Sequence, residues 1–417
     1  MATSRHGTRR LVALRVVAAC CLASLALAAA VAAGGPSPVV RADGGAPNLA
    51  YVAGAGSHAD ELAVVDVAAR QVTAHIAVAG NPGAVVLSFD SHFAYVVQQT
   101  AGSLAFVDAS ARSVTATVPV GPQPHGLVQG YSSGSIALFV AVTGANQVVV
   151  VRPDTRRVIA RIAVGGQPTG EAVAAQGSGI QTADINDEEL YVANTDGNTV
   201  SVISTDRLQV IATIPVPGGP LGVVVPATGG IAYVSTRSGA LLALSLARHT
   251  LLGTVAQLPA GHLAGQMDYD AVTGEVYVPD PAGGEVLVIA PVGVDASGGL
   301  RLPHEPERVL AVPGGPSAVA VTFDGAYAFV TERDRGQVLM LDAASHRPLS
   351  TIAVGGAPIA VITGAYPPAV SQRFASVFAY AALAVLVVAM LYALFVVVRR
   401  NRRPARGAAK QAGDGES

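Results

Sequence analysis

Three short apolar runs separated by turn-forming residues make up residues 191–216, which read YVANTDGNTVSVISTDRLQVIATIPV. Valine, isoleucine and threonine dominate these runs, as is typical of pleated strands. Asparagine, aspartate and glycine fill the first gap, and these residue types form tight turns. A Gly219-Pro220 turn then leads into a fourth apolar run. The stretch therefore predicts a unit of four short antiparallel strands.

The same unit recurs along the middle of the chain. An aromatic residue followed by valine occurs seven times, at Tyr51, Tyr95, Phe139, Tyr191, Tyr233, Tyr277 and Phe329. The intervals are 44, 44, 52, 42, 44 and 52 residues, and periods of this length with strand content are typical of propeller blades. The sequence predicts an all-β fold, a seven-bladed β-propeller of four-stranded antiparallel blades over residues 50–363.

The phase of the repeat predicts how the ring closes. The first unit begins at Tyr51 with its second strand and lacks an inner strand, whereas residues 357–362 form one inner strand too many at the end. We expect this last strand to complete the first blade. The third and sixth repeats carry insertions near residues 176–189 and 292–307, either functional or merely tolerated loops.

The repeat resembles the YVTN repeat of the YncE-like seven-bladed propeller family. The residues that carry the likeness are Tyr191-Val192-Ala193-Asn194 and the two strands that follow them. The resemblance implies the fold over residues 50–363. It leaves the function open, because the family includes surface-layer and periplasmic proteins and similar propellers host cofactor-dependent dehydrogenases and lactonases.

Both ends of the chain carry apolar stretches. Residues 1–33 predict a signal peptide, or an uncleaved signal anchor, with a basic start and an apolar run from Val16 to Ala33. A linker is expected at 34–49 and a juxtamembrane linker at 364–373. Residues 374–398 contain no charge and are long enough for a transmembrane helix. The basic tail at 399–417 predicts a cytoplasmic C-terminus.

These features place the propeller outside a cell membrane, held by a single span. In propellers resembling this one, each inner strand runs from the face with the Gly-Pro turns, the top, to the bottom. The last inner strand ends close to the span, so we expect the bottom face to lie near the membrane.

Composition narrows the function classes. The net charge is −2, and residues 34–373 carry 16 Arg against 26 Asp and Glu. This acidic middle predicts that nucleic acid is not a partner, because phosphate binding needs clustered positive charge. The two cysteines, Cys20 and Cys21, lie in the N-terminal apolar run. We therefore expect a domain without disulfides whose stability comes from packing.

Candidate ligand-binding residues lie where the inner strands begin. Glu171 and Gln266 are polar where the equivalent residues of the other repeats are apolar. A buried lone charge is expensive, so Glu171 needs a partner or water. The predicted residues of the top-face mouth are His125, Thr169, Glu171, His262 and Gln266. The alternative is that each is only a solvated or hydrogen-bonded loop residue.

No catalytic residue and no metal site is predicted. The acidic run at 184–189 lacks the glycine and spacing of a calcium loop, so a solvated loop is the simpler interpretation. The sequence points to no particular cofactor. We expect a binding or protein-interaction module whose partner is an extracytoplasmic protein or a small molecule. The alternatives are a propeller enzyme, either a lactonase-like hydrolase or a quinone-cofactor dehydrogenase, and a structural protein of the cell envelope.

Overall fold

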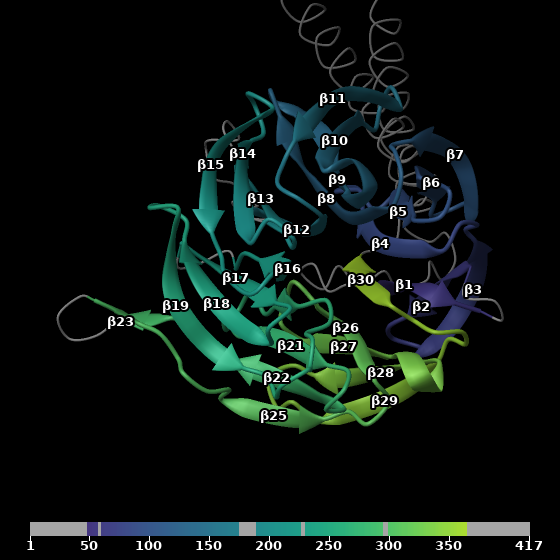
Figure 1. Ribbon diagram of the computed structural model, residues 1–417. Coiled ribbons are helices and arrows are strands. Elements are labelled where there is room, and N and C mark those ends of the chain that lie inside the picture. Colours follow the sequence, from purple (N-terminus) through teal and green to yellow (C-terminus); the bar gives the residue numbers. More distant parts are fainter. Residues whose placement is uncertain (1–47, 57–59, 175–188, 227–229, 295–298, 365–417) are drawn as a thin grey trace, which may run out of the picture. The chain divides into compact units, whose positions relative to one another are not determined.

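The computed structural model describes residues 48–56, 60–174, 189–226, 230–294 and 299–364. Seven four-stranded antiparallel sheets, numbered here as blades 1–7, are arranged in a ring (Figure 1). Blade 1 contains β30 (Ala360–Gly364), β1 (Leu49–Ala55), β2 (Glu61–Asp66) and β3 (Gln71–Ala77). Blade 2 contains β4 (Pro82–Leu87), β5 (Phe93–Gln98), β6 (Ser103–Asp108) and β7 (Ser113–Pro119). The predicted all-β propeller is thus confirmed.

The next three blades follow in chain order. Blade 3 contains β8 (Pro124–Ser132), β9 (Ser135–Val142), β10 (Gln147–Arg152) and β11 (Arg157–Ala163). Blade 4 contains β12 (Pro168–Ala174), β13 (Glu189–Asn194), β14 (Thr199–Ser204) and β15 (Gln209–Pro215). Blade 5 contains β16 (Pro220–Val224), β17 (Ile231–Thr236), β18 (Ala240–Ser245) and β19 (Thr250–Gln257).

Blades 6 and 7 complete the ring. Blade 6 contains β20 (Asp268–Tyr269), β21 (Val276–Asp280), β22 (Glu285–Ile289) and β25 (Arg308–Ala311). Blade 7 contains β26 (Pro316–Val321), β27 (Tyr327–Glu332), β28 (Gln337–Asp342) and β29 (Pro348–Ala353). Two 3-10 turns, η1 (Thr143–Ala145) and η2 (Arg333–Arg335), join second to third strands.

The ring closes as the repeat phase predicts. β30 pairs antiparallel with β1, with Tyr51 opposite Ile362 and Val52 opposite Val361. The first and last strands of the ring therefore share one sheet, which Figure 1 shows as yellow β30 beside purple β1. The two ends of the domain are therefore joined by backbone pairing and packing, without a covalent link.

Burial explains why the sheets stand in a ring. Seven apolar clusters each combine residues from two neighbouring blades, blades 7 and 1 included. In one of them, Tyr191 and Val200 of blade 4 pack with Val223 and Val234 of blade 5. All seven repeated aromatic side chains are at most 4% exposed. Each blade hides both faces against its neighbours, which a single blade cannot do alone.

Of the two insertions, one is described in part. The segment after β22 forms a hairpin of β23 (Gly293–Val294) and β24 (Leu300–Arg301), which projects from the ring in Figure 1. The segment 175–188, between β12 and β13, lies outside the described residues. No helix within the described ranges is long and apolar enough to cross a membrane, and the predicted span at 374–398 lies outside them.

Candidate functional site

The candidate site is a mouth at the centre of the ring, where the inner strands begin. It is open to solvent, and the empty space in and above it is about 1010 Å³. Six of the seven blades contribute to its wall through Gly83, Ala84, Gln99, His125, Gly126, Leu127, Thr169, Gly170, Leu221, Gly222, Val223, Ser235, Ala264, Gly265, Gln266, Met267, Ile359 and Ala360. None of these described lining residues is Asp, Glu, Lys or Arg, and the side chain of Glu171, next to Gly170 in the wall, lies outside the described part of the structure.

Glycine in the wall lets neighbouring inner strands approach closely. A Cβ atom added at Gly170 of β12 would lie 2.0 Å from the carbonyl oxygen of Leu221 in β16. A Cβ atom added at Gly265 would lie 2.3 Å from the carbonyl oxygen of Ser317 in β26. Any side chain at these two positions would push the blades apart, so the wall requires glycine there.

Hydroxyl groups fasten the rim of the mouth from blade to blade. Thr143 Oγ1 donates to the Pro168 carbonyl at 2.5 Å, Thr195 Oγ1 to the Pro220 carbonyl at 2.7 Å, and Ser317 Oγ to the Pro358 carbonyl at 2.7 Å. Pro168 and Pro220 are the first residues of the inner strands β12 and β16, and Pro358 precedes the inner strand β30 by two residues. These repeated bonds hold the rim in one geometry before any ligand arrives.

Three of the five residues predicted from the sequence line this mouth: His125, Thr169 and Gln266. The Thr169 hydroxyl lies 2.5 Å from Thr195 Oγ1 and 3.2 Å from the Leu221 carbonyl oxygen, so it also belongs to the rim bonds. The side chain of Gln266 is exposed in the mouth. These three residues come from blades 3, 4 and 6.

The other two predicted residues are placed differently. Glu171 lies in β12 opposite Val192, and its side chain is outside the described part of the structure. His262 lies before blade 6 and does not line the mouth. Its Nδ1 atom lies 2.7 Å from Oδ2 of Asp280, a fully buried carboxyl at the end of β21. The Asp280 Oδ1 atom accepts the Gly283 N–H at 3.0 Å, so His262 completes a turn within its own blade.

A chain of side-chain hydrogen bonds orients His125. Asn81 Nδ2 donates to Gln99 Oε1 at 2.8 Å, which directs the Gln99 amide nitrogen toward His125 Nδ1 at 3.3 Å. An amide nitrogen only donates, so Nδ1 accepts and the ring carries its proton on Nε2. His125 is exposed to solvent on one side, and the partial loss of hydration on its other side lowers its pKa, which favours this neutral form. His125 therefore offers one N–H donor of defined position.

Sequence reasoning did not single out Gln99 or Asn81. Gln99 follows the second strand of blade 2, and Asn81 immediately precedes the first. A weak signal was present, because an amide side chain precedes the inner-strand proline in three successive blades, at Asn81, Gln123 and Gln167. All three have positive φ angles, between 51° and 56°. Asparagine tolerates this left-handed backbone better than most residues.

A groove and a channel adjoin the mouth. A groove of about 1550 Å³ runs over blades 2 to 4 on the same face and shares Gln99, His125 and Thr169 with the mouth. Its described lining residues also include no Asp, Glu, Lys or Arg. Below the mouth, a channel of about 1170 Å³ shares Leu127, Val223, Gln266 and Met267 with it.

One carboxyl lines the lower channel, that of Asp268 in β20. Its Oδ2 atom accepts the Val321 N–H at 2.8 Å, across the boundary between blades 6 and 7. Burial raises the pKa of Asp268 to about 7, and the Asp270 charge adds to this effect. The residue lies where blade 6 is irregular, because Gln266 forms a parallel bridge to Ala318 of blade 7 instead of extending β20.

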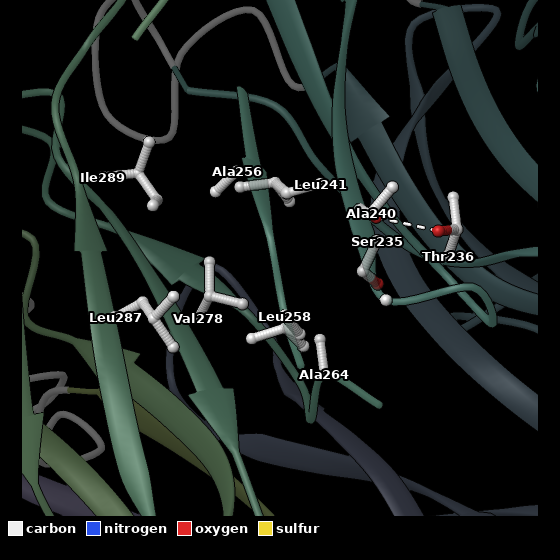
Figure 2. A pocket seen from close by; sticks show the side chains of 11 residues that line it. Ser235, Thr236, Ala240, Leu241, Ala256, Leu258, Ala264, Val278, Leu287 and Ile289 are labelled. Atoms are coloured by element: carbon white, nitrogen blue, oxygen red, sulfur yellow. Dashed lines mark hydrogen bonds between the residues drawn. The ribbon is translucent and has the colours of Figure 1, made fainter. Parts of the chain in front are cut away.

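A second, smaller cavity lies between blades 5 and 6 (Figure 2). Its empty space is about 260 Å³, and aliphatic side chains such as Leu241, Val278 and Ile289 surround it. The Thr236 hydroxyl at its edge already donates to the Ala240 carbonyl at 2.9 Å. This cavity is a gap in blade packing and offers few polar groups to a ligand.

Metal binding has no ready ligand set in the described ranges. No three His, Cys, Asp or Glu side chains gather there closely enough to hold one ion. The acidic run predicted as a loop at 184–189 lies almost wholly outside those ranges, which resume at Glu189.

No protein-family model matches the chain, and no curated protein matches its sequence. Solved structures do match. A functionally unknown protein from Desulfotomaculum acetoxidans gives a TM-score of 0.60 at 14% identity, over 76% of this chain and 99% of that one. A protein from Lactobacillus plantarum gives 0.58 at 16% identity, over 76% and 99%.

An enzyme structure is also similar. Hydrazine synthase from Kuenenia stuttgartiensis gives a TM-score of 0.55 at 20% identity, over 69% of this chain and 90% of that one. At such identities the likeness concerns the fold alone. The chain is a seven-bladed β-propeller, a fold that serves both binding modules and enzymes.

Proposed function

We propose that this chain is a membrane-anchored, extracytoplasmic binding module whose central mouth takes an uncharged, hydrogen-bonding small molecule. The observation that carries the proposal is the composition of the mouth and its adjoining groove. Among the residues that the structure describes, their lining combines carboxamides, hydroxyls and one oriented imidazole with small apolar residues, and contains no Asp, Glu, Lys or Arg.

The absence of charge in these two lining sets selects against ionic ligands. A buried ionic group without a partner of opposite charge loses hydration that nothing replaces. A neutral ligand instead exchanges water for direct hydrogen bonds with Gln99 and Gln266. His125 adds a directed N–H donor, which suits a carbonyl or hydroxyl oxygen. Rim bonds that exist before binding reduce the ordering that binding would require.

The anchor is proposed from the sequence. Residues 374–398 form 25 residues without a charge, and Arg399, Arg400, Arg402, Arg403 and Arg406 follow. A helix of this length crosses a hydrocarbon core of about 30 Å, and clustered arginine favours the cytoplasmic side. Residues 1–33 would direct the propeller across the membrane.

We also propose membership of the YncE-like family with YVTN repeats. Its support is the repeated aromatic-valine pair together with the likeness in fold to the Desulfotomaculum acetoxidans and Lactobacillus plantarum proteins, each matched over 99% of its length.

The test is native mass spectrometry of the full chain purified from its own membranes. The wild-type chain should retain a small, uncharged adduct. Ile359→Trp should lose the adduct, because it adds bulk to the wall of the mouth. Leu263→Trp, on the same face but outside the mouth, is the matched control and should retain it. A bound chromophore in the absorption spectrum, or equal retention by both variants, would contradict the binding-module proposal.

A further inference from the structure

Two turns on the face opposite the mouth hold exposed phenylalanines. Phe89 follows β4 and is 56% exposed, and Phe323 follows β26 and is 48% exposed. A single exposed Phe is common on protein surfaces, but here two exposed rings occupy equivalent turns and have further apolar side chains around them.

The turn around Phe89 is firmly built. Ser88 Oγ donates to Asp90 Oδ1 at 2.7 Å and accepts the Phe93 N–H at 2.9 Å. Asp90 Oδ1 also accepts the His92 N–H at 3.1 Å. The side chains of the residues before and after Phe89 thus form hydrogen bonds within the turn, and Phe89 lies between them.

The turn around Phe323 repeats this pattern. Thr322 Oγ1 donates to Asp324 Oδ1 at 2.6 Å and accepts the Tyr327 N–H at 2.9 Å. Asp324 Oδ1 accepts the Ala326 N–H at 3.1 Å. Blades 2 and 7 therefore use one motif, a hydroxyl residue, Phe and Asp, to present an aromatic ring.

The two turns lie on either side of the point where the described chain ends. Blades 2 and 7 are the ring neighbours of blade 1, whose inner strand β30 ends at Gly364. A Cβ atom at Gly364 would contact Leu87 and Ser91, beside Phe89, and Thr363 lines the lower channel together with Phe323. Further apolar side chains extend the surface, since Tyr131 stacks on Phe89 at 5.3 Å and Val272 is 68% exposed.

We propose that Phe89 and Phe323 insert into the interfacial layer of the membrane and fix the tilt of the propeller. This inference rests on the proposed anchor at 374–398. The ten residues from Gly364 to the start of the span reach at most about 35 Å, so this face is held near the lipid. Phe rings are among the apolar side chains that interfacial segments bury at the boundary between headgroups and acyl chains.

The charges of the two turns favour zwitterionic lipid. Asp90 and Asp324 follow the two rings in sequence, and their carboxylates accept hydrogen bonds from the turn. Burial and hydrogen bonds act on Asp90 in opposite senses, and the net effect is a lowered pKa, which keeps it ionised. The turns after β2 and β6 on the same face add exposed Arg70 and Arg112 beside Asp66 and Asp108, so this face carries charges of both signs. The partner we propose is therefore a zwitterionic headgroup layer such as phosphatidylcholine.

The chain contains no Trp, so a single introduced Trp is the only indole emitter. Full-length Phe89→Trp and Phe323→Trp are reconstituted into phosphatidylcholine vesicles with or without brominated acyl chains. Brominated lipid should reduce the emission of both by about twofold, because an interfacial ring contacts the upper acyl chains. Leu263→Trp, on the mouth face, should keep its emission.

Two results would overturn the proposal. In the first, Phe89→Trp emits equally in both lipids although the chain floats with the vesicles. This result would support the anchor and contradict the interfacial contact of Phe89. A blue-shifted but unquenched Trp would mean that protein covers this face. A chain that does not float with vesicles would instead defeat the proposed anchor. Unchanged thermal midpoints of the variants show that they fold.

Discussion

Val52 and Val361 lie opposite each other in the pairing of β1 with β30, although they come from the two ends of the ring-forming sequence. Both are at most 1% exposed and belong to the apolar cluster between blades 7 and 1. Blade 1 has a fourth, inner strand only because these two segments meet. Ring closure is therefore a matter of packing and backbone pairing in one blade.

Weakening this junction should destabilise the whole ring. Val52→Ala and Val361→Ala should each lower the unfolding free energy by about 2 kcal/mol, from lost burial and the remaining cavity. The double variant should deviate from additivity by about 0.5 kcal/mol or more, since the residues are in contact. Urea unfolding measures these values. Ile159→Ala, at a 42% exposed position, is the control; an equal loss there would contradict the closure account.

The His125 imidazole should make stability depend on pH in a defined sense. Its pKa is lowered by burial, so the folded chain binds this proton only at lower pH than the unfolded chain, whose histidines titrate near about 6.5. Between these two pKa values the unfolded state holds more protons, so stability rises with pH and levels off above about 6.5. The difference between wild type and His125→Gln in urea midpoints from pH 5 to 8 isolates this group. A difference between the two urea midpoints that grows above pH 7 would contradict this account of His125.

Ionisation of Asp268 should make stability depend on pH in the opposite sense. Its pKa is raised to about 7, so between about 4 and 7 the folded state holds the extra proton, and stability falls as pH rises. Asp268→Asn removes the cost of ionisation and should stabilise the chain at pH 8 by about 1–2 kcal/mol, with little effect at pH 5. Solvent near this half-buried group keeps the gain below the upper bound of about 4 kcal/mol. A loss of stability at pH 8 would contradict this account.

The bond between His262 and Asp280 predicts a structural role for His262. His262→Ala leaves a fully buried carboxylate oxygen without its partner and should lower the unfolding free energy by about 1–3 kcal/mol. Ligand retention in native mass spectra should not change. His304→Ala, at an exposed position, is the control for losing an imidazole. Loss of ligand without loss of stability would instead place His262 in the binding site.

The fold could be predicted because each blade buries the same type of residue at the same position of its repeat. The residues that carry the period, such as Tyr51, Tyr191 and Phe329, are the ones most completely buried between blades. The extra strand at 357–362 could be predicted from phase alone, and β30 is found at Ala360–Gly364. Any sequence that must hide both faces of seven similar sheets shows this pattern.

The site was less predictable because its residues come from different blades and lie close together only once the ring has formed. His125 and Gln266 could be selected as polar residues at inner-strand starts. The position of His262 could not, because it depends on Asp280, a buried acid one strand away. Asp268 also escaped prediction, since its place follows from the bridge between Gln266 and Ala318. The one sequence sign of that irregularity is Leu263, where other blades have proline.

The central claim, an extracytoplasmic propeller on a single-pass anchor, is tested most directly by labelling single cysteines in intact cells. Cys20 and Cys21, the only native cysteines, are first replaced by alanine. Thr100→Cys lies on an exposed turn of the mouth face, and Ala408→Cys lies in the basic tail. A membrane-impermeant maleimide should label Thr100→Cys in intact cells and Ala408→Cys only after lysis. Labelling of Thr100→Cys only after lysis would contradict the account.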